Sequence, residues 1–275
     1  MNGDDRRARL LVNADDFGLH SDIDRGILQC VERGRVQSIS FCPTGQSLEW
    51  NKMVELMDQG VHVGLHLTLV GEPWSTDGRL IPNWKHLARQ LLLGGRAIRA
   101  AIGAEIQRQL LLCADNGIDP QRLSHLDSHQ HVHVLAGIWE LCLNQAKEHG
   151  IRRIRVPWCP TLRIIKKSVG GLALQSLSWR RAQQVDGFFA CLGLAHAGNN
   201  TVAILSDELH AAACMGRPHV ELVAHPGKST KELRTRYSSW EFDWDTERDA
   251  LLSREFADAV ALNGYAFAEP FHQAF

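Results

Sequence analysis

Four histidines and an aspartate alternate within residues 124–133, SHLDSHQHVH, and side chains of these types bind metal ions or move protons. The alternating residues are His125, Asp127, His129, His131 and His133. On an extended strand they all face one way, about 6.6 Å apart at a rise of roughly 3.3 Å per residue. A metal holds imidazole nitrogens at about 2.0–2.1 Å, so one or two of these histidines can reach a single ion.

We therefore expect this segment to leave its strand at about Asp127 and to present His129 from the loop beyond. The neighbouring His125, Asp127 and His131 then line the pocket and contact substrate, or support His129. A polar strand end with hydrogen-bonded histidines is the alternative interpretation.

Asp15 and Asp16 are adjacent carboxylates that follow the apolar run RLLVNA. Like charges this close repel, which predicts a raised proton affinity for one of them, and a cation relieves the repulsion. One aspartate can then bind a metal ion while the other accepts a proton from water. Helix capping is the alternative, but Ser21 lies nearer the next helical pattern and is the expected N-cap.

Three further residues interrupt or end apolar runs. His66 lies inside VGLHLTL, where a single histidine is more often a core residue than a ligand. His225 precedes Pro226, which ends the next apolar run and places the imidazole at a strand end. Arg155 lies just before Pro157 and either pairs with a carboxylate or lies at the surface.

These residues need strands that end side by side, and the chain alternates apolar runs with helical patterns. Strands are expected at 9–14, 36–42, 61–69, 122–127, 151–157 and 220–225. Helices are expected between Ser21 and Gly34, near 47–59, within 83–117 as one or two, and at 135–149, 201–216 and 245–263. This alternation predicts an α/β fold with a parallel sheet, a (β/α) barrel that is irregular or incompletely closed. A doubly wound open sheet is the alternative, although no glycine-rich dinucleotide fingerprint follows the first strand.

Composition is that of one soluble α/β domain over residues 1–275. The net charge is −1 without a basic stripe, so neither nucleic acid nor an anionic membrane is an expected partner. The first ten residues carry no apolar signal segment. The seven cysteines form no C-x-x-C pair, which favours free thiols and a cytoplasmic protein.

Four segments together resemble the YdjC-like family of carbohydrate deacetylases: LLVNADDFGL, VGLHLTL, SHLDSHQHVH and ELVAHPG. The resemblance covers nearly the whole chain and implies a barrel-like fold, a divalent metal and N-deacetylation of an acetylated amino sugar. Carried over by position, it implies Asp16, His66 and His129 as metal ligands. It further implies Asp15 as catalytic base, His225 as the acid for the leaving amine, and Arg155 as the residue that orients the base.

The resemblance points to Mg²⁺, whereas two histidines and one carboxylate also suit Zn²⁺, Co²⁺ or Mn²⁺. Trp74 and Trp158 lie in expected rim loops and are candidates for stacking on sugar rings. A metal-dependent phosphoesterase or sugar isomerase, and a non-catalytic sugar- or metal-binding protein, are the rival interpretations. A homodimer is compatible with the sequence, which fixes no interface.

Overall fold

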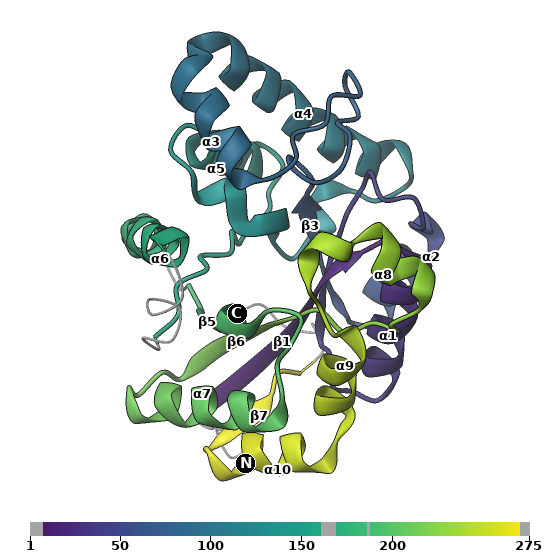
Figure 1. The fold of residues 1–275 in the computed structure, drawn as a ribbon, viewed down its shortest axis with the longest axis vertical. Coiled ribbons are helices and arrows are strands. Elements are labelled where there is room, and N and C mark those ends of the chain that lie inside the picture. Colours follow the sequence, from purple (N-terminus) through teal and green to yellow (C-terminus); the bar gives the residue numbers. More distant parts are fainter. Residues whose placement is uncertain (1–7, 161–168, 186–187, 270–275) are drawn as a thin grey trace.

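A parallel sheet forms the centre of the molecule in the computed structural model, which describes residues 8–160, 169–185 and 188–269 (Figure 1). Its strands are β1 (Ala8–Phe17), β2 (Ser38–Phe41), β3 (His62–Leu67), β4 (Leu126–Ser128), β5 (Ala190–Leu192), β6 (His219–Ala224) and β7 (Tyr265–Phe267). Their order is β4-β3-β2-β1-β6-β5, with β7 beside the start of β1. All pairings are parallel, and the apolar β1 is buried along most of its length, as a central parallel strand must be.

The sheet curls into a half-barrel flanked by helices, so the predicted α/β barrel is confirmed in its incompletely closed form. The expected strand at 151–157 is wrong. Only Ile154 forms a parallel bridge, to Leu126 of the short β4. Pro157 cannot donate a ladder hydrogen bond, so pairing does not continue and the sheet path ends at β4.

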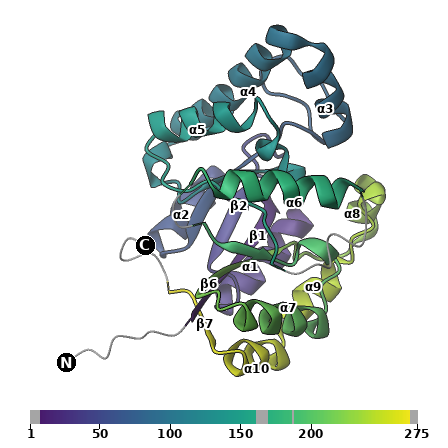
Figure 2. The same ribbon diagram turned by 90° about the vertical axis from the view of Figure 1, so that its left-hand side faces the viewer.

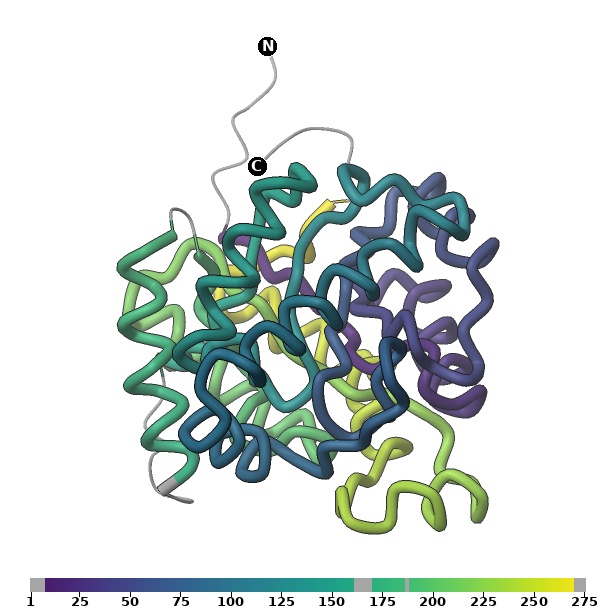
Figure 3. Tube along the Cα trace, turned by 90° about the horizontal axis from the view of Figure 1, so that it is seen from above, coloured from purple at the N-terminus to yellow at the C-terminus, as the bar shows by residue number. Residues whose placement is uncertain are grey.

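Helices surround the curled sheet, and in the view from above β1 crosses the middle of the molecule (Figure 3). The α-helices are α1 (Ser21–Glu32), α2 (Trp50–Asp58), α3 (Trp84–Leu93), α4 (Gly95–Asp115), α5 (Trp139–Glu148), α6 (Val169–Ala182), α7 (Val202–Cys214), α8 (Lys231–Arg236), α9 (Trp244–Leu252) and α10 (Arg254–Leu262). Short 3-10 turns are η1 (Pro120–Arg122), η2 (His129–Val134), η3 (Leu194–His196) and η4 (Ser238–Trp240). Helices α3, α4 and α5 gather at one end of the molecule and α7 and α10 at the other (Figures 1 and 2).

Two expected helix details differ from the structure. The N-cap of α1 is His20, whose ring accepts from the backbone N–H of Asp22, so the predicted Ser21 cap is wrong. The helix expected at 245–263 is two helices, because Ser253 takes an extended conformation and caps α10 through its hydroxyl.

Strand register brings the carboxyl ends of the strands to one edge, which we call the rim. Ala14 of β1 pairs with Ala224 of β6, and His66 of β3 pairs with Asp127 of β4. The residues that follow these strands therefore meet at the same end of the half-barrel. Elsewhere all seven cysteines are free, with Cys214 exposed and the other six buried. In the described ranges no helix has both the length and the apolar content to cross a bilayer.

Candidate active site

Asp16 lies between two imidazole rings at the rim. Its Oδ1 atom is 3.3 Å from His66 Nε2 and 3.0 Å from His129 Nδ1, and all three side chains are buried. The backbone of Asp16 has a φ of 69°, a left-handed conformation that side chains rarely adopt. This strained position lies in a register irregularity of β1 between Ala14 and Phe17, and it aims the carboxylate at both histidines.

Asp127 lies behind His66 and fixes the state of its ring. The carboxylate accepts from His66 Nδ1 at 2.7 Å, which leaves Nε2 facing Asp16. Its other oxygen accepts from the Ser40 hydroxyl at 2.8 Å and from Arg155 at 2.6 Å. A carboxylate that holds the far nitrogen of a histidine in this way is typical support for a metal ligand.

Arg155 is a buried junction between carboxylates. It donates to both oxygens of Asp15, at 2.7 and 2.8 Å, and through Nε to Glu221 at 2.7 Å. Arg153 donates to the other oxygen of Glu221 at 2.8 Å. The structure therefore pairs Arg155 with Asp15, one of the two alternatives that its position allowed.

Glu221 did not emerge from the sequence. Its only signal is an acidic residue inside the apolar run VELVA, and a fully buried carboxylate needs charged partners of this kind.

Both carboxyl groups of the Asp15–Asp16 pair have a lowered pKa, so the expected raised proton affinity of one of them is wrong. Burial opposes ionisation of Asp15, but the Arg155 guanidinium outweighs burial and lowers the pKa. Burial also opposes ionisation of Asp16, and the rings of His129 and His66 lower its pKa well below the usual range. The partners, not the mutual repulsion, decide both protonation states.

The other buried charged side chains near Asp15 and Asp16 are Asp127, Glu221 and His66, and they are ionised too. Burial disfavours their charges, but Arg155 outweighs it and lowers the pKa values of Asp127 and Glu221. For His66, burial opposes the charged ring, but Asp127 and Asp15 outweigh burial and raise its pKa to about 10.

The summed charge of this buried cluster of side chains matches that of a divalent cation. Three of its carboxylates, Asp15, Asp127 and Glu221, face the guanidinium groups of Arg153 and Arg155, whereas the fourth, Asp16, faces the two imidazoles. Four carboxylates against two guanidinium groups leave an excess of two negative charges in a buried place, where unbalanced charge is costly. A proton on His66 reduces this excess in the metal-free protein, and a divalent cation would displace that proton from the ring and remove the whole excess.

The spacing from Asp16 to each histidine fits as well. Ligand atoms at about 2.1 Å from one ion, at angles of about 90–110°, lie roughly 3.0–3.4 Å apart. The two distances from Asp16 Oδ1 to the histidine nitrogens, 3.3 and 3.0 Å, fall in this range. The second ring nitrogen of His129 is buried without a hydrogen-bond partner. Among the described residues, two groups have candidate ligand atoms that all lie within 4.8 Å of one another: Asp16, Cys42 and His66, and Asp15, His66 and Asp127. His129 is in neither group, so its ring would move closer to His66 to share an ion with it.

The sequence of this chain matches a known protein family over most of its length. A family model described as YdjC-like protein matches residues 9–262. The chain belongs to the YdjC-like protein family. The resemblance seen in the four sequence segments is thereby confirmed.

Two curated relatives and one solved structure are similar over most of their lengths. A "Chitooligosaccharide deacetylase" of Proteus mirabilis is 29% identical over 265 residues, covering 93% of this chain and 95% of that protein. A "Carbohydrate deacetylase" of Mus musculus is 29% identical over 262 residues, covering 80% of this chain and 78% of that protein. A crystal structure of an Enterococcus faecalis V583 protein has a TM-score of 0.67 at 19% identity, covering 96% of this chain and 97% of its own, which shows a shared fold.

Within this YdjC-like chain the alternating histidines separate into different environments. The strand β4 ends at Ser128, and Gln130 and His131 take left-handed conformations, so the segment leaves the strand as expected. His125 lies before β4, fully buried, with its ring between the hydroxyls of Ser40 and Ser124 at 2.9 and 2.8 Å. The polar atoms of His125 and Asp127 are thus hydrogen-bonded within the protein, and neither side chain is exposed to a substrate.

His131 and His133 lie beyond the turn. His133 bonds Ser128 Oγ at 2.7 Å and the backbone carbonyl of Arg155 at 2.9 Å, which supports the arginine. His131 is half-buried and its Nδ1 has no partner. Burial lowers the pKa of His131 to about 3, so the ring is neutral near pH 7.

His225 follows β6, and the register with β1 places it next in line to Asp15. Its backbone N–H donates to Glu247 at 3.1 Å, and its ring packs against Phe242 with centroids 5.1 Å apart. The Nδ1 atom is buried without a hydrogen-bond partner, so the ring keeps a nitrogen for another group.

The two tryptophans predicted to stack on sugars are engaged elsewhere. Trp74 is buried, its Nε1 donates to the carbonyl of Leu69 at 3.0 Å, and Arg79 lies over its ring. Trp158 is half-buried among other aromatic rings, including Trp179, with the Arg217 guanidinium 4.8 Å from its ring centre.

Other aromatic residues lie at the site instead. Trp240 contacts His129 with ring centroids 4.9 Å apart, and Phe242 contacts His225. The sequence carries a signal for them in the aromatic-rich stretch SSWEFDW, which follows the strand that ends at His225.

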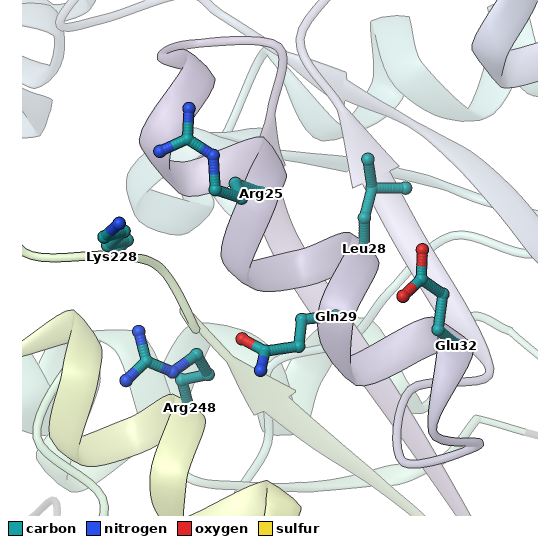
Figure 4. A pocket seen from close by; sticks show the side chains of 6 residues that line it. All are labelled: Arg25, Leu28, Gln29, Glu32, Lys228 and Arg248. Carbon is teal, nitrogen blue, oxygen red and sulfur yellow. The ribbon is translucent and has the colours of Figure 1, made fainter.

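A hollow on the outer surface contains none of the predicted site residues. It lies between α1 and α9 and is lined by Arg25, Leu28, Gln29, Glu32, Lys228 and Arg248 (Figure 4). Arg25 pairs with Asp22, and Arg248 pairs with Asp245. Its arginines are therefore already matched by carboxylates.

Proposed function

We propose that this chain is a divalent-metal-dependent hydrolase that removes N-acetyl groups from acetylated amino sugars or their oligosaccharides. The names of its relatives supply the reaction and substrate class. The observation that carries the metal dependence is the buried excess of negative charge around Asp16, which faces two imidazoles.

Asp16, His66 and His129 are the residues proposed to hold the ion. A bound divalent cation supplies a Lewis acid that polarises a carbonyl oxygen and lowers the pKa of water. We rank Mg²⁺ first from the family, while the two imidazole ligands also suit Zn²⁺, Co²⁺ or Mn²⁺.

Asp15 is proposed to accept the proton of the attacking water at its carboxylate. The bidentate contact with Arg155 fixes the orientation of that carboxylate and keeps it ionised. His225 then donates a proton to the departing nitrogen, since register brings it to the same end of the half-barrel as Asp15. The balance is one amide and one water consumed, and one acetate and one amine released.

The surrounding polar residues act through these groups. We propose that Asp127 and His125 support the site rather than touch substrate, because both are fully buried with protein partners. His131 keeps an unpartnered ring nitrogen near the site and remains a candidate for substrate contact. A cytoplasmic location and a homodimer stay predictions.

Acetate release from N,N′-diacetylchitobiose tests the proposal, with metal-stripped and metal-restored protein measured beside Asp15→Asn. We expect release that needs the added ion and that the substitution lowers by about 10²–10⁴-fold, the range of general base catalysis. Metal binding in the variant, followed by calorimetry, is the control that the site is intact.

The rival functions give other products with the same protein. Phosphate release from a sugar phosphate without acetate release indicates a phosphoesterase. Metal binding with no turnover of either substrate, and indifference to Asp15→Asn, indicates a binding protein. Failure of the wild type to bind any divalent ion contradicts the metal site itself.

A further inference from the structure

One segment, residues 236–244, reaches across the rim of the half-barrel. It meets the loop after each of the six strands of the sheet path, through Leu19 after β1, Gln46 after β2, Glu72 after β3, His129 after β4, Gly198 and Asn199 after β5, and His225 after β6. We call residues 236–244 the rim strap. A segment with contacts to every rim loop is placed to fix the positions of several site residues at once.

Polar contacts hold the strap at both ends. At its start, the single hydroxyl proton of Tyr237 is shared between two acceptors, the Leu19 carbonyl at 3.3 Å and Glu72 at 3.1 Å. Towards its end, the backbone N–H of Asp243 donates to the Gly198 carbonyl at 2.8 Å. Between these anchors Glu241 takes a left-handed conformation, and Trp240 and Phe242 stand on either side of it in the chain.

Trp240 packs on the ring of His129. Their centroids are 4.9 Å apart with an interplanar angle of 31°, and Tyr237 also packs against Trp240, with centroids 4.2 Å apart. The single hydrogen bond of the His129 ring, to Asp16, leaves rotation about that contact open. Contact with the indole limits this rotation and fixes the plane of the imidazole.

Phe242 packs on the ring of His225. Their centroids are 5.1 Å apart, and the Nδ1 atom of that ring is buried without a hydrogen-bond partner. A Cβ atom at Gly198 would lie 2.1 Å from Phe242 Cγ, so the phenyl ring rests directly on the backbone there. This close packing fixes the phenyl ring, and the phenyl ring bounds His225.

We propose that Trp240 and Phe242 are two separate positioning residues on the rim strap. Trp240 sets the orientation of the metal ligand His129, and Phe242 sets the orientation of the proton donor His225. The inference rests on the proposed function, because it takes the roles of both histidines from there. One short segment, the rim strap, then adjusts metal affinity through Trp240 and proton transfer through Phe242.

Two substitutions separate these effects. Trp240→Ala is expected to weaken Co²⁺ binding about tenfold, the lower range for loss of a group that supports a metal ligand, and Trp240→Phe to restore it. Phe242→Ala is expected to leave Co²⁺ affinity unchanged and to lower kcat for acetate release about tenfold or more, with Phe242→Leu intermediate. Calorimetric titration with Co²⁺ and steady-state kinetics on N,N′-diacetylchitobiose give the two readouts.

Trp50→Ala is the matched control, because Trp50 is a half-buried tryptophan whose ring packs on Phe41, which is none of the proposed site residues. Equal loss of Co²⁺ affinity in Trp240→Ala and Phe242→Ala, or in the Trp50 control, overturns the inference. So does unchanged behaviour of both strap variants. If the wild type binds Co²⁺ but releases no acetate, the proposed reaction fails while the Trp240 effect on Co²⁺ affinity still tests the strap.

Discussion

At the scale of single residues, Asp127 shows how a carboxylate without access to substrate governs a site. It holds one ring nitrogen of His66 and, through Arg155, is joined to Asp15. The same carboxylate therefore supports the proposed metal ligand and the proposed base. Its full burial makes each of these contacts strong, since solvent does not screen them.

Replacing Asp127 by asparagine keeps the shape and removes the charge that orients His66. We expect divalent-ion affinity to fall by about 10–100-fold, measured by calorimetry on the folded variant. Ser38→Ala is a control on the neighbouring part of the sheet, because its hydroxyl contacts only the backbone carbonyl of His62. Unchanged affinity in Asp127→Asn would show that the carboxylate does not support the ligand.

Glu221 tests the cost of a buried charge. Glu221→Gln leaves the guanidinium groups of Arg153 and Arg155 without a shared carboxylate, and we expect unfolding free energy to fall by about 3–5 kcal/mol. Urea denaturation measures this change. Asp258→Asn removes the partner of Arg254 in a pair that is largely exposed, and should leave stability unaltered. Similar losses in the two variants would refute the argument from burial.

At the scale of elements, the strand β3 contains a glycine, Gly64, whose lack of a side chain makes room for the ring of His125. Gly64 pairs with Ser40 of β2, and the ring of His125 lies over it to reach the Ser40 hydroxyl. A Cβ atom at Gly64 would lie 2.2 Å from His125 Cε1, far inside contact distance. The glycine is thus required by the close approach of the imidazole, not by its own backbone angles.

Gly64→Ala is therefore expected to displace His125 and to cost about 1–3 kcal/mol of stability, the usual range for overpacking a core. Thermal unfolding provides the measurement. Gly103→Ala is the matched control in α4, where the added methyl meets Leu141 at 3.6 Å and a helix interior favours alanine by roughly 0.5–1 kcal/mol. A Gly64 variant as stable as the wild type would mean that the ring moves without cost.

At the scale of the whole molecule, buried neutral histidines make stability depend on pH. Burial lowers the pKa of His62 to about 4, of His131 to about 3 and of His133 to about 4, from an ordinary value of 6.5. The unfolded chain then binds more protons than the folded one below pH 6.5. Their stabilising effect is complete above pH 6.5 and is lost as the pH falls through that value toward 4.

We expect the histidines to lower the free energy of unfolding of the metal-free protein from pH 7 to pH 4.5, by about 2 kcal/mol for His62 alone. Over most of this window Asp15, Asp16 and Asp127 do not yet contribute, because their lowered pKa values place their protonation at lower pH. Burial raises the pKa of Asp24 to about 6, so its protonation in this window favours the folded state and offsets part of the decrease. Urea unfolding at several pH values measures the slope, and His62→Gln should reduce it. A slope that the substitution leaves unchanged would contradict the assignment.

The sequence by itself determined the alternation of apolar runs and helices, and so the parallel sheet with its shared rim. In such a sheet every strand end lies at the same edge, which is why Asp16, His66 and His129 could be expected together from their positions alone. The departure of residues 129–131 from the strand also followed, because one ion cannot accept several same-face histidines. Local pattern was sufficient in each case.

Only the tertiary structure decided which side chains touch. Glu221 reaches Arg155 across the half-barrel, and Trp240 and Phe242 arrive on a strap far along the chain from His129. The expected strand at 151–157 also depended on pairing, because Ile154 meets only Leu126 of the short β4 and Pro157 cannot extend the ladder. Contacts near 3 Å depend on register, twist and loop path, and these are set by packing of the whole sheet and not by any local run of residues.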